Sequence, residues 1–224
     1  REEVTNNRGG WAKLEFSKTE HLTSEGYFTY LKEFKGGHSL NAVAGYSYFE
    51  KNGENFNAEN YDFGVEGLKY WDLESGSYLT DGKAKMGSKK DITERLFALY
   101  ARANYSYNDK YMVTATIRHE GSSKFAAENR WGNFWALSGG WRVSGEEFMK
   151  EFDWVNDLKI RFGYGVTGNN DFDASYMANT LSRDQYWMLP SGSWAFVYGP
   201  SSNVNPYLGW EEKKEWNIGV DYSF

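Results

Sequence analysis

The stretch LFALYARANYSYNDKYMVTATIRHE, residues Leu96–Glu120, decides the fold, because apolar and polar residues alternate along it. One face of its first half carries Phe97, Leu99, Ala101, Ala103, Tyr105 and Tyr107. The other face carries Ala98, Tyr100, Arg102, Asn104 and Ser106. After a turn at Asn108-Asp109-Lys110, which Asn and Asp favour, the alternation resumes with Tyr111, Val113, Ala115 and Ile117. A period of two is that of β-strands, so the stretch is predicted to form an antiparallel hairpin.

The length of these runs points to a membrane. They reach about 11 residues, as a strand that crosses a bilayer does, whereas globular strands usually have five or six. The composition agrees, because aromatic residues make up 19% of the chain while its mean hydropathy is −0.73. Strands with one apolar and one wet face average out as polar in this way. We therefore expect lipid on one face and water on the other, although a soluble sandwich would also alternate.

The same alternation recurs along the chain. It predicts about eight strands in all, the others lying near 12–16, 27–34, 39–48, 135–143, 158–166 and 216–224. A turn at Lys35-Gly36-Gly37-His38 is short, whereas connections at 51–91, 121–130 and 167–208 are longer. Outer-membrane barrels have short periplasmic turns and long extracellular loops, so the long connections are expected outside the cell. Segment 145–157 is expected to carry one helical turn, at Glu146–Lys150, on the periplasmic rim. The predicted fold is an all-β, antiparallel transmembrane barrel.

Several function classes lack support. With no Cys, disulfides and thiolate metal sites are excluded, and the three histidines have no ligand-like spacing. No serine sits in a nucleophile elbow, and Glu146-Glu147 and Glu211-Glu212 adjoin lysines as solvated rim groups would. Neither catalysis nor a metal centre is expected. The net charge of −6 comes without a basic patch, which argues against nucleic acid as a partner.

Two motifs are open to a ligand-binding interpretation. Gly163-Tyr164-Gly165-Val166-Thr167-Gly168 fits G-x-G-x-x-G, but a dinucleotide site needs a helix to begin there, and Asn169–Asp173 reads as a loop. We expect these glycines to provide space or a bend in a strand. Asn169, Asp171 and Asp173 alternate as a calcium loop does. Ala174 and Thr180 replace the expected Gly and Glu, so a solvated loop is favoured over loop calcium.

Aromatic residues in the long loops are the candidate ligand contacts. Those in 167–208 are Tyr186, Trp187, Trp194, Phe196 and Tyr198, and those in 51–91 are Tyr61, Tyr70, Trp71 and Tyr78. Flat apolar rings beside polar groups suit stacking on sugars or packing on a partner protein. Packing within the loop, or an aromatic girdle at the membrane interface, would also account for them, and docking of a partner on the loops as a group is favoured over ligand contact by any single ring.

An ordered series of motifs runs through the region after Arg95. Its first half contains Asp109-Lys110-Tyr111, Thr114–Arg118, and Gly121-Ser122-Ser123-Lys124-Phe125 after Glu120. Then come Asn129-Arg130-Trp131-Gly132, Trp141–Ser144, Glu147–Met149, Asp157–Arg161, and Gly165-Val166-Thr167-Gly168-Asn169 after Tyr164. In this order they resemble the later barrel region of SusC/RagA-type TonB-dependent outer-membrane transporters of Bacteroidota. The resemblance is most specific over Arg95–Asn169, resumes near Trp210–Phe224, and is loose over Arg1–Thr93.

This resemblance carries implications beyond the residues themselves. It implies a barrel of about 22 strands with a plugged lumen, located in the bacterial outer membrane. Such transporters import glycans or peptides with energy relayed through TonB, and a SusD-like lipoprotein caps the extracellular mouth. Residues 1–224 are then expected to be a partial TonB-dependent receptor β-barrel domain, without the plug or the TonB-contacting segment.

Two alternatives belong to other classes. A terminal aromatic residue, Phe224, after alternating apolar residues resembles the assembly signal of complete outer-membrane proteins, and eight is an allowed strand number. That would give a small self-contained eight-stranded barrel acting as an anchor or adhesin. The second alternative is a soluble β-sandwich that binds carbohydrate. We favour the truncated chain of a larger barrel.

Overall fold

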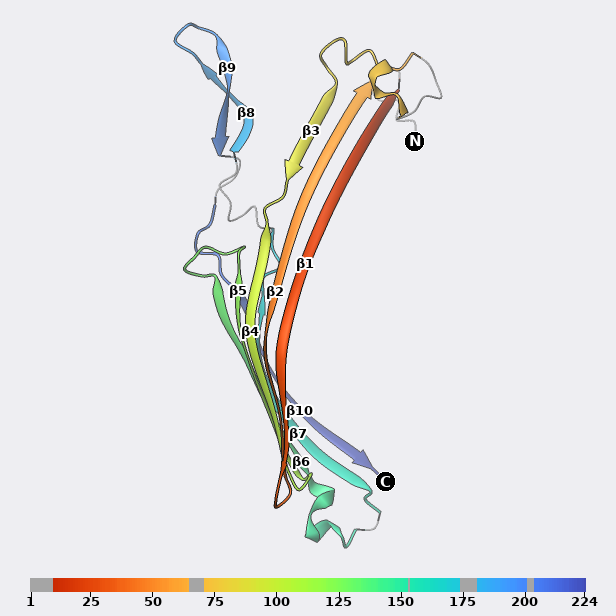
Figure 1. Cartoon of the computed structure of the whole chain (residues 1–224), viewed down its shortest axis with the longest axis vertical. Coiled ribbons are helices and arrows are strands. Elements are labelled where there is room, and N and C mark those ends of the chain that lie inside the picture. The colour runs from red at the N-terminus through yellow and green to blue at the C-terminus, as the bar shows by residue number, and fades with distance from the viewer. Residues whose placement is uncertain (1–9, 65–70, 153, 174–180, 201–203) are drawn as a thin grey trace. The chain divides into compact units, whose positions relative to one another are not determined.

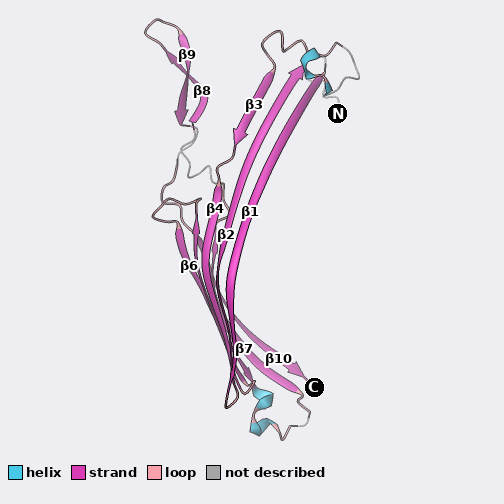
Figure 2. Ribbon diagram, viewed as in Figure 1, coloured by secondary structure: helices cyan, strands magenta, loops and turns pink. Residues whose placement is uncertain are grey.

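The computed structural model describes residues 10–64, 71–152, 154–173, 181–200 and 204–224, and strands dominate these ranges (Figures 1 and 2). The strands are β1 (Trp11–Phe34), β2 (His38–Tyr61), β3 (Lys85–Lys90), β4 (Glu94–Tyr107), β5 (Tyr111–Ser122), β6 (Trp131–Arg142), β7 (Asp157–Asn169), β8 (Leu181–Met188), β9 (Trp194–Pro200) and β10 (Glu211–Ser223). Helical structure in the described ranges is limited to 3-10 turns η2 (Leu73–Ser75), η3 (Val143–Gly145) and η4 (Glu147–Met149).

One eight-stranded sheet contains most of the strands. Its order is β1-β2-β4-β5-β6-β7-β10, with β3 paired to β2 off this path, and β8 and β9 form a separate antiparallel hairpin. The described part of the chain therefore confirms the predicted all-β, antiparallel class. By internal contacts the chain divides into two compact units, Arg1–His21 with Lys51–Thr93, and Leu22–Glu50 with Glu94–Phe224.

No helix in the ranges that the structure describes is long and apolar enough to cross a membrane.

The register of the second unit places the apolar residues of neighbouring strands in rows. One row is Ala103, Ala115, Leu137, Tyr164 and Trp216, the next is Tyr105, Val113, Gly139, Phe162 and Ile218, and a third is Tyr107, Tyr111, Trp141, Ile160 and Val220. The opposite face carries polar rows such as Asn104, Thr114, Ser138, Gly163 and Asn217. The apolar face stays open, with Leu137 48% and Ile218 65% exposed, as a lipid-facing surface requires.

The first unit contains one strand segment that the sequence predicted, 12–16, and others that it did not. Segments 12–16 and 27–34 belong to one strand, β1, and β2 continues to Tyr61 into a region expected to be loop. Strand β3 lies in the same expected loop. Here polar side chains bind one another across strands: the Asn55 amide donates to Glu15 Oε1 and Ser17 Oγ, each over 2.8 Å. A strand with two wet faces shows no apolar alternation, and for this reason the sequence predicts a loop where β2 continues and β3 lies.

The predicted turns are confirmed. Asn108 and Asp109 have positive φ values of 51° and 55°, and Gly36 and Gly37 have 89° and 83°, as tight hairpin connections require. The helical turn expected at 146–150 is a 3-10 turn over Glu147–Met149, drawn in cyan below the sheet in Figure 2. These connections place the ends of β4, β5, β6 and β7 beside each other.

Candidate functional site

The predicted motif residues meet where β5 ends, β6 begins and β7 ends. We call this meeting point the motif junction, formed by Gly121–Phe125, Asn129–Gly132 and Gly165–Asn169. Gly121 pairs with Trp131 across β5 and β6, and Glu212 of β10 pairs with Gly168 of β7. Antiparallel pairing of β5 with β6, β6 with β7 and β7 with β10 therefore brings together three motifs that are separated in sequence.

A fully buried serine anchors the junction. Ser122 is 0% exposed; its backbone N–H donates to the Arg130 carbonyl over 3.1 Å, and its hydroxyl accepts from the Asn170 amide over 3.2 Å. Ser123 exchanges two bonds with Arg95, donating from its N–H over 2.8 Å and accepting at Oγ from the Arg95 N–H over 2.7 Å. The Gly-Ser-Ser motif thus joins β4, β5 and the segment after β7.

Lys124 ties the segment after β7 to β4. Its ammonium donates to the Phe172 carbonyl over 2.9 Å and lies 3.4 Å from Glu94 Oε2. The Lys124 side chain is only 12% exposed, so water screens these contacts weakly. The lysine is therefore a structural cross-link of the junction.

An aromatic cluster fills the junction. Phe125 and Phe134 are 2% and 7% exposed, and the Trp210 ring centre lies 5.1 Å from that of Phe125 and 5.0 Å from that of Phe134. Phe172 packs on Phe125 at 5.1 Å. The Phe134 ring occupies the space that a Cβ would need at Gly132 and Gly168. This explains two of the motif glycines, because only a residue without a side chain fits against the ring.

One member of this cluster breaks the alternation of its strand. Phe134 shares the wet face of β6 with Ser138, Gly140 and Arg142, where an apolar ring breaks the pattern. Trp210 precedes β10, and its indole N–H donates to the Arg130 carbonyl over 2.9 Å. A large apolar residue on an otherwise polar face is the signal that would have identified a packing centre there.

The two ligand-binding interpretations of the motif residues receive no geometric support. The segment Gly163–Gly168 lies inside β7, with no helix beginning after it, so the arrangement required by a dinucleotide is missing from this described strand. Asn169 donates to Glu211 Oε2 over 3.0 Å and accepts from the Asp171 N–H over 2.9 Å. No three His, Asp or Glu side chains in the described residues gather as a metal site; Ala174 and Thr180 lie outside those residues.

The candidate loop aromatics lie on the β8–β9 hairpin. Tyr186 pairs with Phe196, with ring centres 4.4 Å apart, and Met188 pairs with Trp194. Side chains of directly paired residues share a face, so Tyr186, Trp194, Phe196 and Tyr198 lie on one face and Trp187 on the other. All five are more than half exposed. The structure thus brings four of the five together as an aromatic face.

Two of the aromatic residues in the expected loop 51–91 pack within their own unit. Tyr61 is the last residue of β2, and its ring centre lies 5.4 Å from that of Tyr78 and 6.4 Å from that of Trp11. Packing within the unit accounts for these rings. Trp71 is 76% exposed, and Tyr70 lies outside the described residues.

Glu146, expected to be a solvated rim group, instead joins three elements. It accepts from Tyr111 Oη over 2.5 Å, from Trp141 Nε1 over 3.1 Å and from Lys110 Nζ over 3.2 Å. These hydrogen bonds, led by that from Tyr111, hold the pKa of Glu146 below its ordinary value. The carboxylate thus fastens the η3–η4 connection to the turn-side ends of β5 and β6.

Aromatic residues mark both ends of the apolar face. At the turn end, Tyr107 and Tyr111 stack with ring centres 6.3 Å apart, beside Trp141. At the other end, Trp131 stacks on His119 at 4.8 Å. Residues 131 and 141 lie on the same face of β6, about 33 Å apart along the strand, or about 25 Å in height for a strand tilted by about 40°. That height equals the apolar band of an outer-membrane barrel.

Comparisons with known proteins agree with this geometry. The family described as TonB dependent receptor-like, beta-barrel matches residues 3–224. The chain is 34% identical over 210 residues to the TonB-dependent receptor P39 of Formosa agariphila, which covers 89% of this chain and 18% of the receptor. It is 33% identical over 146 residues to the TonB-dependent receptor SusC of Bacteroides thetaiotaomicron, covering 64% of this chain and 15% of SusC.

The fold is also that of a solved relative. The RagAB peptide importer in its closed-closed state superposes with a TM-score of 0.73 at 23% identity, covering 95% of this chain and 22% of the other. The chain spans less than a quarter of the length of each of these proteins. The family match and the relatives together show that the chain belongs to the TonB-dependent receptor β-barrel family and is of the SusC/RagA type.

Proposed function

We propose that this chain forms part of the barrel wall of a bacterial outer-membrane importer that takes up glycans or peptides. Energy would be relayed through TonB, by parts of the protein outside this chain, and a SusD-like lipoprotein would cap the extracellular mouth. The observation that carries the proposal is the two-faced sheet of the second unit, in a chain of SusC/RagA type. No catalytic step and no cofactor enter the proposal.

The polar face supports a hydrated passage. Arg118 binds Glu120 through Nε and Nη2, each over 2.8 Å, and Arg161 Nη2 donates to Asp221 over 2.8 Å. These side chains share a face with Asn104 and Ser138, opposite the apolar rows. Charged groups at bilayer depth are costly toward lipid and tolerated toward a wet lumen, so this face suits the lumen.

The two other functions considered have less support. The chain aligns with 18% of one receptor and 22% of the RagAB chain, which supports a role as a portion of a large barrel over a small anchor or adhesin. A soluble β-sandwich buries its apolar faces between two sheets. Here the apolar rows of the second unit remain exposed.

The aromatic face of the β8–β9 hairpin supports a role in capture. Tyr186, Trp194 and Tyr198 are 58%, 64% and 67% exposed. A two-stranded hairpin is marginally stable alone, so its aromatic face gains by packing on a lid or a substrate. We propose this face, and not Trp187 on the reverse side, as the contact for the lipoprotein lid or for substrate.

Uptake in the producing bacterium tests both the importer and the contact role of the aromatic face of the β8–β9 hairpin. We expect deletion of the gene to abolish growth on one class of glycan or peptide, and a proton uncoupler to stop its uptake while leaving surface binding intact. The double variant Trp194→Ala with Tyr198→Ala should weaken lipoprotein co-purification or surface substrate binding at least tenfold. Trp187→Ala is the matched control and should change either by less than twofold. Unchanged growth of the deletion strain on every glycan and peptide would refute the importer.

A further inference from the structure

The apolar face of the second unit is not uniform, because five alanines make a hollow in it. Ala42 and Ala44 on β2, Ala101 and Ala103 on β4, and Ala115 on β5 line an open groove with a volume of about 600 Å³. Phe28 and Tyr30 on β1 stand at one side, and Ile117 on β5 at the other. Four adjacent strands, β1, β2, β4 and β5, therefore build a groove with a floor of methyl groups and walls of larger side chains.

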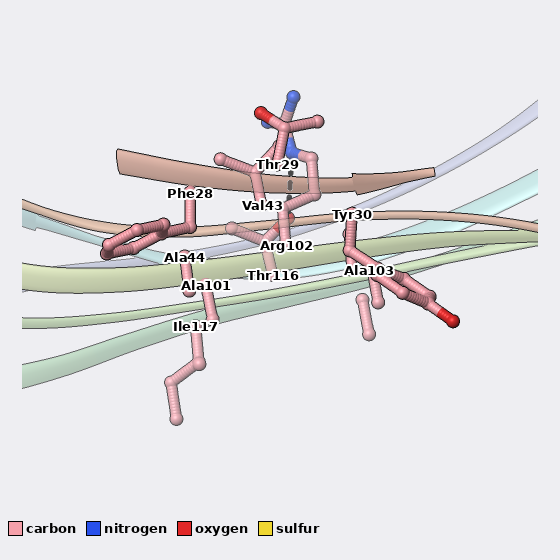
Figure 3. A pocket seen from close by; sticks show the side chains of 12 residues that line it. Phe28, Thr29, Tyr30, Val43, Ala44, Ala101, Arg102, Ala103, Thr116 and Ile117 are labelled. Carbon is pink, nitrogen blue, oxygen red and sulfur yellow. Dashed lines mark hydrogen bonds between the residues drawn. The ribbon is translucent and has the colours of Figure 1, made fainter. Parts of the chain in front are cut away.

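Nothing in the floor or walls can bind a polar ligand through side chains except the Tyr30 hydroxyl. Figure 3 shows Phe28, Ala101 and Ile117 on one side of the sheet, with Thr29 and Arg102 pointing to the opposite side. Arg102 Nε donates there to Thr116 Oγ1 over 3.3 Å. The groove is thus a hydrocarbon surface, and its polar neighbours serve the other face.

The depth of the groove limits what fills it. Ala103 and Ala115 lie in the same row as Leu137, four residues from Trp141 at the turn end and six from Trp131 at the other end. The groove therefore lies near the middle of the apolar band, continuous with the lipid-facing rows. A flexible hydrocarbon chain fits such a hollow, because small residues allow a neighbour to approach the backbone closely.

A cation lies on the turn side of the groove. Lys32 follows Tyr30 by two residues on the same face of β1, and its Nζ lies 4.9 Å from the ring centre of Phe34. Long basic side chains extend toward the interface and attract the anionic phosphates of lipid head groups. Turns of this short kind face the periplasm, so the head group in reach belongs to the inner leaflet.

We propose that the alanine groove is a fixed seat for one phospholipid of the periplasmic leaflet, with an acyl chain along the alanines and its phosphate near Lys32. The inference rests on the proposed function only in placing the sheet in a bilayer. The bulky walls make the seat concave. A lipid held there contacts β1, β2, β4 and β5 at once, and so links the strands of this part of the wall.

Native mass spectrometry of the intact protein tests the seat. The protein is extracted in mild detergent, stripped of loosely held lipid, and titrated with 1-palmitoyl-2-oleoyl-phosphatidylethanolamine. We expect one phospholipid to remain on the wild type. Ala103→Trp, which fills the groove, should lower retention at least tenfold, and Lys32→Gln about threefold. Ile218→Trp, on the same apolar face but outside the groove, should retain lipid as the wild type does.

Four results would overturn the seat. The wild type retains no phospholipid, or Ala103→Trp retains as much as the wild type. Alternatively, the wild type retains lipid A in place of phospholipid, or it retains a second copy of the protein that is lost in Ala103→Trp. If Ala103→Trp does not reach the membrane folded, Ala44→Leu provides a smaller filling with the same expectation. Membrane fractionation distinguishes failure of the lipid seat from failure of the proposed importer. A wild-type barrel found in the membrane without the lipid refutes only the seat. A protein found outside the membrane refutes the importer as well.

Discussion

The ring of Phe134 occupies the space that a side chain at Gly168 would need. This contact links β6 to β7 at the motif junction, where Phe134 is 7% exposed. Gly168→Ala therefore forces the ring or the strand to move, and overpacking of this kind costs about 1–3 kcal/mol. We expect the variant barrel to unfold at lower temperature in heat-modifiability gels of the intact protein.

The matched control for this substitution lies on the neighbouring strand. A Cβ at Gly139 would meet only the Met112 carbonyl oxygen, at 3.9 Å, which is ordinary contact. Gly139→Ala should therefore leave the unfolding temperature unchanged. Equal behaviour of the two alanine variants would show that the contact between Phe134 and Gly168 does not constrain the junction.

The carboxylate of Glu146 predicts a pH dependence of stability. Because its hydrogen bonds from Tyr111 and Trp141 hold its pKa below the unfolded value, its contribution is complete above the unfolded pKa and is lost as the pH falls through the folded pKa. The wild-type barrel should resist detergent unfolding less at acidic pH than at neutral pH. Glu146→Gln should be less stable than the wild type at neutral pH, with a smaller change on acidification.

Glu147 provides the comparison for this experiment. Its pKa is also lowered, by the hydrogen bond from Lys150, but that pair is on the surface, with the two side chains 66% and 82% exposed. Exposed pairs contribute little to stability. Glu147→Gln should follow the wild-type pH profile, and a profile as altered as that of Glu146→Gln would contradict the role given to Glu146.

Adjacent residues of β6 predict opposite responses to the same substitution. Leu137 lies in an apolar row and Ser138 in a polar row near the middle of the band. Arginine facing lipid at that depth costs about 2–4 kcal/mol, whereas a wet face accepts it. Leu137→Arg should reduce the folded barrel recovered from outer membranes, and Ser138→Arg should not. If Ser138→Arg reduced the recovery and Leu137→Arg did not, the lipid-facing and water-facing sides of β6 would be the reverse of those described.

Much of the second unit could be predicted because a sheet with one apolar and one polar face imposes a strict pattern. From Phe97 to Tyr107 and from Tyr111 to Ile117 every second residue is apolar, and the register places these residues on one face. The turn at Asn108-Asp109 followed from residue types that adopt positive φ. The motifs around Ser122 were recognised in order, but their joining by Trp210 and Phe172 depends on contacts distant in sequence.

The polar strands and the hairpin show where alternation stops being informative. The parts of β1 and β2 outside the predicted strands carry hydrogen-bonding side chains such as Ser17 and Asn55, so the sequence resembles a loop although the strands continue. The β8–β9 hairpin has a different sequence signal: its apolar residues, such as Tyr186, Trp187 and Met188, are consecutive and do not alternate, so the sequence predicts a loop there. The sequence around Glu146 predicts a solvated carboxylate, because its three donors, including Lys110, come from other turns and strands.

The environment of each face can be measured directly by spin labelling. The chain contains no Cys, so single cysteines can be placed at successive positions from Phe97 to Tyr107, in an intact protein freed of other cysteines. In outer-membrane vesicles, we predict that oxygen reaches labels at Phe97, Leu99, Ala101, Ala103 and Tyr105 best, whereas a polar nickel chelate reaches labels at Tyr100, Arg102 and Asn104 best. A period of two with this phase would establish the lipid-facing wall. Accessibility without that period, or with the opposite phase, would contradict it.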